Sequence, residues 1–264
     1  MDADEPRNLN CVYCIAQDKM DPKAKNDDPL GTAEHILSLH PLSVVISGGE
    51  PTLHSALPTV LDRFAGKTAL ILDSNGTVPF HKDLVDALRR ADASVRISID
   101  SADPAVNGTL RPNRNPDADD LSAIEANLLL LLREHIFTSV HTVVTTVNRA
   151  ALFGLGERLA LLGIRRWHLY GLLAVGRGRV CFSSMYVDAE TLFETQKDLA
   201  QRFPDMRITF SLPNEAGAGG AFPIADSAGR FFVEPDGCAL VCPEKDPKRP
   251  TAKELGELCS GRYV

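Results

Sequence analysis

Short apolar segments alternate with longer amphipathic segments from residue 31 to residue 171. The short segments are rich in β-branched residues and predict strands at 42–47, 68–73, 94–100, 137–146 and 164–171. The longer segments predict helices at 32–39, 55–65, 81–91, 120–134 and 149–162. Regular alternation of this kind is typical of a parallel sheet with crossover helices. The nearly continuous apolar character of the strands indicates that both faces of this sheet are covered.

The pattern changes after residue 172. The stretch AVGRGR is followed by a predicted helix at 188–203 and a short strand at 206–210. Near the C-terminus, the segment FFVEPDGCALVC predicts a β-hairpin, because Pro235, Asp236 and Gly237 have strong turn preferences. We therefore expect a core in residues 1–180 and a small α+β extension in residues 181–264.

Composition narrows the class of protein. The chain has 264 residues, with 28 Lys and Arg against 35 Asp and Glu, so its net charge is −7 and nucleic acid is not an expected partner. The longest apolar run is the five leucines at 128–132, far short of the ~20 residues that a membrane span needs. Because the acidic N-terminus does not resemble a secretory signal, a cytoplasmic location is expected.

The six cysteines are distributed unevenly, at positions 11, 14, 181, 238, 242 and 259. The pair Cys11 and Cys14 forms a C-x-x-C motif, which is compatible with a zinc site, a redox disulfide or an iron–sulfur cluster. A second metal site is conceivable at Cys238, Cys242 and Cys259, with Cys181 as a further thiol. The alternative is that these cysteines are small apolar residues of the hairpin.

Polar residues and glycines follow three successive predicted strands. They are the segments Ser47–Pro51, Asp73–Thr77 and Ser98–Ser101. Each segment alone is explained by a turn or a helix cap. Because the carboxyl ends of parallel strands meet at one edge, together they predict a continuous polar rim of the kind that forms sites in α/β barrels.

The motifs NLNCVYC, SGGEP, SNG and SID occur at residues 8–14, 47–51, 74–76 and 98–100. In this order, and at strand ends, they resemble the radical S-adenosylmethionine superfamily. The later segments TVVTTVN and LYGLLAVGRGR, and the C-terminal hairpin, resemble members that modify peptides or build cofactors. The resemblance implies a partial (β/α)6 barrel, here with a missing or atypical first strand.

The resemblance also assigns roles to individual residues. It implies that Cys11 and Cys14 ligate two irons of a four-iron, four-sulfur cluster and that Tyr13 packs beside the adenine. Gly48, Gly49, Glu50 and Pro51 would receive the methionine amino group, and Asn75 would line the same mouth. Ser98 and Asp100 would face the ribose or carboxylate, Arg111 would pair with the carboxylate, and Asn148 is a weaker candidate. No catalytic residue is assigned.

The implied reaction is reductive cleavage of S-adenosylmethionine, which generates a 5′-deoxyadenosyl radical for hydrogen abstraction. The substrate would be a peptide or a small biosynthetic intermediate, and a flavodoxin or ferredoxin would donate the electron. However, Arg7 occupies the position of the first cysteine of the family's C-x3-C-x2-C motif. A guanidinium has no lone pair to donate to iron.

Three explanations account for Arg7: lost N-terminal sequence, an altered sequence, or a degenerate family member. A two-cysteine cluster that some other ligand completes is a further alternative. The degenerate member would be a non-catalytic protein that binds a nucleotide or a partner. A zinc-stabilised α/β binding module, joining Cys11 and Cys14 to the C-terminal cysteines, is a third class of protein that the sequence allows. The seven histidines show no metal-binding spacing, and Trp167 and Tyr170 are expected to pack within the sheet.

Overall fold

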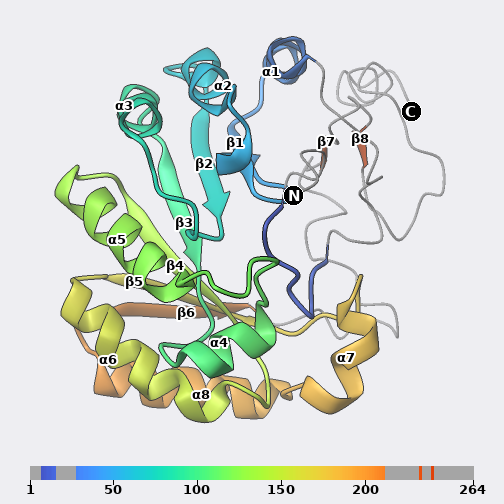
Figure 1. Cartoon of the computed structure of the whole chain (residues 1–264), viewed down its shortest axis with the longest axis vertical. Helices are drawn as coiled ribbons and strands as arrows, with labels where there is room; N and C mark the ends of the chain where they lie inside the picture. The colour runs from blue at the N-terminus through green and yellow to red at the C-terminus, as the bar shows by residue number, and fades with distance from the viewer. Residues whose placement is uncertain (1–6, 16–27, 212–231, 234–238, 241–264) are drawn as a thin grey trace.

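The fold is taken from a computed structural model, which describes residues 7–15, 28–211, 232–233 and 239–240. Six parallel strands form one curved sheet in the order β1-β2-β3-β4-β5-β6 (Figure 1). The strands are β1 (Ser43–Ile46), β2 (Ala69–Ser74), β3 (Ser94–Ser98), β4 (Thr138–Val144), β5 (Arg166–Gly171) and β6 (Arg207–Ser211). Each strand thus pairs with its neighbour in sequence, as expected for a partial barrel.

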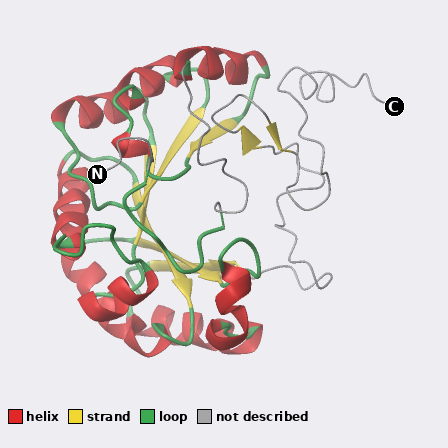
Figure 2. Cartoon of the chain, turned by 45° about the vertical axis from the view of Figure 1, so that its right-hand side comes forward, coloured by secondary structure: helices red, strands yellow, loops and turns green. Residues whose placement is uncertain are grey.

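Helices cover the convex side of this sheet, and none of the helices in the described residues lies over the concave side (Figure 2). The helices are α1 (Pro29–Ser38), α2 (Leu57–Phe64), α3 (Lys82–Arg90), α4 (Pro104–Leu110), α5 (Asp120–Arg133), α6 (Leu152–Leu162), α7 (Gly178–Met185) and α8 (Ala189–Arg202). Two 3-10 turns, η1 (Pro51–Leu53) and η2 (Arg149–Ala151), precede α2 and α6. The predicted α/β class with a parallel sheet is confirmed.

The two faces of the sheet differ in chemistry. Alternate strand residues that face the helices are fully buried and apolar, among them Leu72, Ile97, Val140 and Leu169. The residues between them face the concave side, which we call the lumen face, and they are only half-buried. The expectation that both faces are covered was therefore wrong for the described residues, and the lumen face is accessible to a ligand.

Two helices occupy segments where the sequence predicted none. Asp103 caps α4 by accepting hydrogen bonds from the amides of Ala105 (2.8 Å) and Val106 (3.3 Å), and Pro104 starts the helix. Both features are standard start signals, which the prolines after Arg111 obscured. The second helix, α7, contains the proposed domain boundary at residue 180, and β6 continues the sheet beyond that boundary.

The C-terminal hairpin is confirmed by an antiparallel pair, β7 (Phe232–Val233) and β8 (Ala239–Leu240). Its predicted turn at residues 235–237, and the cysteines at 238, 242 and 259, lie outside the described residues. Among the described residues, no helix is both long and apolar enough to cross a membrane.

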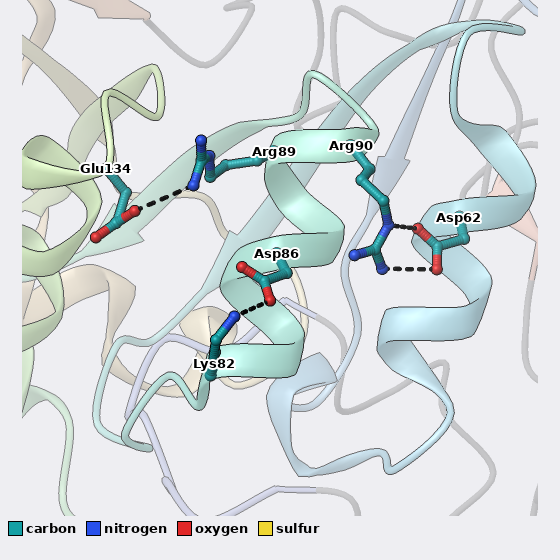
Figure 3. Close-up of polar contacts among 6 residues, drawn as sticks. All are labelled: Asp62, Lys82, Asp86, Arg89, Arg90 and Glu134. Atoms are coloured by element: carbon teal, nitrogen blue, oxygen red, sulfur yellow. Dashed lines mark hydrogen bonds and ion pairs between the residues drawn. The ribbon is translucent and has the colours of Figure 1, made fainter.

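Ion pairs link neighbouring helices on the outer surface (Figure 3). Arg90 of α3 donates two hydrogen bonds to Asp62 of α2, at 2.9 and 2.8 Å, and Arg89 contacts Glu134 after α5 at 3.4 Å. Within α3, Lys82 pairs with Asp86. Most of these side chains are solvent-exposed, and Asp86 and Glu134 are half-buried. Ion pairs at such positions add little stability. Within each pair the positive and negative charges cancel. The lumen face is therefore the better candidate for a site.

A test of the packing compares two glycines of α6. A Cβ at Gly156 would lie 2.3 Å from the Phe203 ring, whereas a Cβ at Gly154 would meet nothing within 4 Å. Alanine raises helix propensity by up to ~1 kcal/mol at either position, but overpacking costs about 1–3 kcal/mol. We expect Gly156→Ala to have the lower free energy of unfolding in urea, and equal values would contradict this packing.

Candidate functional site

The two N-terminal cysteines lie on a loop that hydrogen bonds attach to the carboxyl ends of the strands. The Asn8 side chain donates to Thr77 Oγ1 (2.7 Å) and accepts from Asn75 Nδ2 (2.8 Å). The Asn10 amide donates to the carbonyl of Pro112 (2.8 Å), and the Val12 amide to that of Leu110 (3.0 Å). The protein itself therefore positions this loop, which is the dark-blue segment in Figure 1.

The glycine- and arginine-rich segment before α7 supports the other side of the loop. The Arg177 amide donates to the Cys14 carbonyl (3.0 Å), and its side chain donates to the Asn10 carbonyl (3.0 Å). Gly176 has a φ of 58°, and a Cβ there would lie 2.4 Å from the Cys14 carbonyl oxygen. Only glycine fits at this close approach. These contacts explain Gly176 and Arg177, the first two residues of the GRGR sequence.

Cys11 and Cys14 are half-buried free thiols. Burial raises the pKa of Cys11, and the nearby charge of Arg111 partly offsets this effect. Within the described part of the chain, no three histidine, cysteine or acidic side chains are grouped to hold a metal ion. Because Arg7 cannot ligate iron, residues 7, 11 and 14 provide two of the three thiolates that the family motif supplies.

A buried polar triad lies behind the cysteine loop. Asp100 is fully buried, and it accepts hydrogen bonds from the Tyr13 hydroxyl and from the Val143 amide (2.9 Å). Burial raises the pKa of the Asp100 carboxyl, while Arg111 opposes that shift. Burial also raises the pKa of Tyr13, and the negative charge of Asp100 adds to the effect. The tertiary structure thus brings the predicted residues Tyr13, Asp100 and Arg111 together.

Arg111 has unused hydrogen-bonding capacity in this triad. Its side chain is 4% exposed, and its Nε has no hydrogen-bond partner within the part of the chain that the structure describes. Burial alone would lower the pKa of Arg111, but its electrostatic interactions with Tyr13, Cys11 and Asp100 outweigh that effect and raise it. A permanently charged, buried N–H donor without a partner is costly. It therefore favours an anionic ligand at this position.

Glu50 connects the SGGEP turn to the end of β2. Its Oε1 accepts from the Thr52 amide (3.1 Å), the Thr52 hydroxyl (2.6 Å) and the Ser74 hydroxyl (2.8 Å). Its Oε2 accepts a single bond among the described residues, from the Asn75 amide (2.7 Å). Oε2 therefore retains acceptor capacity, while Oε1 holds the turn in place.

The remaining predicted residues are those of the SGGEP turn, Ser98 and Asn148. Gly48 is exposed with a φ of 146° and has nothing within 4 Å of a Cβ position, so the turn of Gly48, Gly49 and Pro51 presents bare backbone. Ser98 is half-buried at the end of β3.

Asn148, by contrast, uses its whole amide inside the protein. It accepts from Thr145 N (2.8 Å) and Oγ1 (2.9 Å), and it donates to the carbonyls of Asp100 (2.9 Å) and Val143 (3.0 Å). Asn148 therefore positions Asp100 and has no donor or acceptor left for a ligand.

The sequence reasoning missed a cluster on the lumen face, which we call the lumen cluster. It consists of Asp73, Arg96, His141, His168 and Tyr170. The rings of His141, His168 and Tyr170 contact one another, with centroid separations of 5.4, 5.4 and 4.5 Å. Trp167 and Tyr170 were both expected to pack within the sheet. Trp167 is buried there, whereas Tyr170 is half-buried on the lumen face. A usable signal was the alternation of polar and apolar residues in WHLYG.

We predict that Glu50→Gln destabilises the fold. A glutamine has one acceptor oxygen, so one or more of the four donors around Glu50 would lose its partner inside the protein, at about 1–3 kcal/mol in the free energy of unfolding. The control is Glu157→Gln, because Glu157 is exposed on α6 and makes one ion pair with Arg202 at 3.2 Å. Equal urea midpoints for the two variants would contradict the structural role of Glu50.

Acid should also destabilise the fold through His141. Burial lowers the pKa of His141 from 6.5 to about 3, with help from the charge of Arg96 and from His168; Tyr170 is the other ring it faces. Between these two pKa values the unfolded chain binds more protons, so stability decreases as the pH falls below 6.5. This contribution reaches about 2 kcal/mol at pH 5. Urea titrations at pH 7 and pH 5 should show that His141→Gln has a much smaller loss of stability on acidification than the wild type. The exposed control His81→Gln should lose as much stability as the wild type.

Comparisons with known proteins agree with this geometry. The sequence profile described as the Radical SAM superfamily matches residues 8–155. The uncharacterised protein MJ0907 of Methanocaldococcus jannaschii is 25% identical over 165 residues, which cover 60% of this chain and 56% of that protein. Among solved structures, SuiB of Streptococcus suis bound to S-adenosylmethionine matches with a TM-score of 0.75 and 17% identity, over 99% of this chain and 64% of SuiB.

A second solved structure, anSMEcpe with bound AdoMet and the Cp18Cys peptide, has a TM-score of 0.70 and 16% identity, over 99% of this chain and 80% of that one. The chain spans less than two thirds of the length of MJ0907 and of SuiB. The structural matches establish the partial-barrel fold. The profile covers more than half of the sequence and includes the cysteine loop, the SGGEP turn and the Asp100 strand end, so the chain belongs to the radical SAM superfamily.

Proposed function

We propose that this chain binds S-adenosylmethionine at the carboxyl ends of β1 to β4 and directs its radical chemistry at a peptide. The observation that carries the proposal is the buried, unpartnered Nε of Arg111 beside Tyr13 and Asp100. A carboxylate is the ligand group that such a donor fits best. The molecules bound in two solved relatives, S-adenosylmethionine in SuiB and AdoMet with a peptide in anSMEcpe, support the same interpretation.

The chain's own residues would bind the two charged ends of the methionine moiety. Arg111 would donate to the carboxylate. The ammonium group would meet the free acceptor capacity of Glu50 Oε2 and the bare backbone at Gly48. Tyr13, Asn75, Ser98 and Asp100 would line the rest of the mouth, toward the adenine and ribose. Because most of these groups are already held by protein hydrogen bonds, binding would need little reorganisation.

Cys11 and Cys14 would hold two irons of a four-iron, four-sulfur cluster. When bound, such a cluster supplies the electron that cleaves the sulfonium C–S bond of S-adenosylmethionine and yields the 5′-deoxyadenosyl radical. The electron would come from a flavodoxin- or ferredoxin-type donor in the cytoplasm. Arg7 does not fit this group, so the cluster needs a further ligand beyond residues 7–14. For that reason we also consider a non-catalytic protein that binds S-adenosylmethionine alone.

Calorimetric titration with S-adenosylmethionine tests the binding site. Arg111→Gln should weaken binding by roughly 10- to 100-fold, because a charge-assisted hydrogen bond contributes about 1.5–3 kcal/mol. Arg111→Lys, which keeps the charge, should lie between that variant and the wild type. Arg133→Gln is the control, since Arg133 is 73% exposed at the end of α5. Equal affinity of Arg111→Gln and the wild type would contradict the proposed site.

Anaerobic reconstitution with iron and sulfide separates the two functions. An enzyme should give an electron paramagnetic resonance signal after reduction, and this signal should change when S-adenosylmethionine is added. Cys11→Ser and Cys14→Ser should abolish it, whereas Arg7→Cys should increase iron uptake. A wild-type protein that binds S-adenosylmethionine but takes up no iron would support the non-catalytic function instead.

A further inference from the structure

The lumen cluster is held rigidly by its own contacts. His168 Nδ1 lies 2.7 Å from Thr209 Oγ1, and its Nε2 lies 3.0 Å from Ser211 Oγ, so both ring nitrogens are engaged. His141 Nε2 lies 3.1 Å from Ser139 Oγ. Arg96 donates two hydrogen bonds to Asp73, one of them at 2.6 Å. Residues from five neighbouring strands thus form one connected surface.

Two polar groups of this surface remain available. Among the described residues, neither His141 Nδ1 nor the Tyr170 hydroxyl has a hydrogen-bond partner. Both side chains are half-buried on the lumen face, which no helix among the described residues covers (Figure 2). A group that enters the lumen can therefore form hydrogen bonds with both of them while it packs against the rings.

The surface carries no net charge near neutral pH. The charges of Arg96 and Asp73 cancel in their ion pair. Burial and the charge of Arg96 lower the pKa of His141 to about 3 and also lower that of His168, so both imidazoles are neutral. Burial raises the pKa of Tyr170, which keeps the phenol protonated. A charged ligand group would lose its hydration here without meeting an unpaired opposite charge.

The cluster begins at the level of the candidate cofactor site. Tyr170 pairs in register with Val143, whose amide donates to Asp100 Oδ1 at 2.9 Å. His141 and His168 pair with each other two residues deeper in the lumen. A ligand group that contacts these rings would therefore lie next to the site that we propose for S-adenosylmethionine.

From these observations we propose that the lumen cluster is the substrate subsite and that it accepts an uncharged, hydrogen-bonding side chain of a peptide, such as a carboxamide. His141 and Tyr170 would contact this side chain, while His168 packs against both rings and Arg96 and Asp73 form an ion pair on the same face. The inference rests on the proposed function, and it specifies the substrate class for that same site.

Two isosteric peptides test the subsite directly. Acetyl-Gly-Gln-Gly-amide and acetyl-Gly-Glu-Gly-amide differ only in a carboxamide or a carboxylate. Each would be titrated at neutral pH into the full chain, loaded with S-adenosylmethionine and labelled with ¹⁵N-histidine and ¹³C-tyrosine. We expect the glutamine peptide to shift the His141 and Tyr170 resonances with saturation, and the glutamate peptide to bind at least roughly 10-fold more weakly, because a carboxylate loses more hydration on burial.

Variants assign the binding to the cluster. Tyr170→Phe keeps the ring and should weaken the glutamine peptide roughly 3- to 10-fold, as expected for the loss of one neutral hydrogen bond. His141→Ala should weaken it by at least as much. The matched control is Tyr186→Phe, since Tyr186 follows α7 and packs on Phe182. A second control is the affinity for S-adenosylmethionine, which Tyr170→Phe should leave unchanged.

The outcomes separate the two proposals. If S-adenosylmethionine binds but the glutamine peptide shifts no lumen resonance, or binds no better than the glutamate peptide, the subsite is refuted and the proposed function stands. Equal peptide affinities for Tyr170→Phe and Tyr186→Phe would refute it as well. If S-adenosylmethionine itself does not bind to the wild type, the proposed function fails first.

Discussion

The burial of the Asp100 carboxylate is the constraint that connects the parts of this molecule. A carboxylate removed from water requires hydrogen bonds and a compensating charge, and here each comes from a different segment. Tyr13 supplies one bond from the cysteine loop, Val143 supplies another from β4, and Arg111 supplies the charge from the end of α4. Asn148 then binds the Asp100 carbonyl from the start of η2. One side chain thereby holds together segments that are far apart in the sequence.

The curvature of the sheet assigns separate tasks to its two faces. The convex face buries aliphatic residues against the helices, and this burial provides most of the apolar stabilisation. Because that core is complete without the lumen face, the lumen face is free to carry polar residues. These residues satisfy one another through the Arg96–Asp73 pair and the His168 contacts, so the polar surface does not need a ligand to be stable.

Family membership and cluster chemistry are separate questions in this chain. The cysteine loop is attached by hydrogen bonds from Asn8, Asn10, Val12 and Arg177, none of which involves a thiol. The fold therefore does not depend on how many cysteines the loop carries. The loop, the SGGEP turn and the buried triad are all present in a chain that has an arginine at position 7, where the family motif has a cysteine.

The order of elements and the position of the site at the strand ends were predictable from the sequence, because both follow from local patterns. Segments with the hydrophobic pattern of a strand alternate with segments that have the pattern of a helix, and this alternation specifies a parallel sheet. Motifs such as SGGEP specify turns within a few residues. Helix α4 was equally local, with Asp103 and Pro104 as its start signal, but the prolines beyond Arg111 suggested a loop.

Other features depend on which strands become neighbours. The pairing of His141 with His168 joins residues 27 positions apart (168 − 141), and the Arg96–Asp73 pair spans 23 positions. The same holds for Asn148, whose amide donates to the carbonyl of Asp100, beyond the end of β3, and to that of Val143 in β4. The sequence by itself determined the fold class and the polar residues and glycines at the strand ends. Only the tertiary structure decided which side of each strand faces the lumen and which polar groups there remain free, because those properties arise when the sheet closes into a curve.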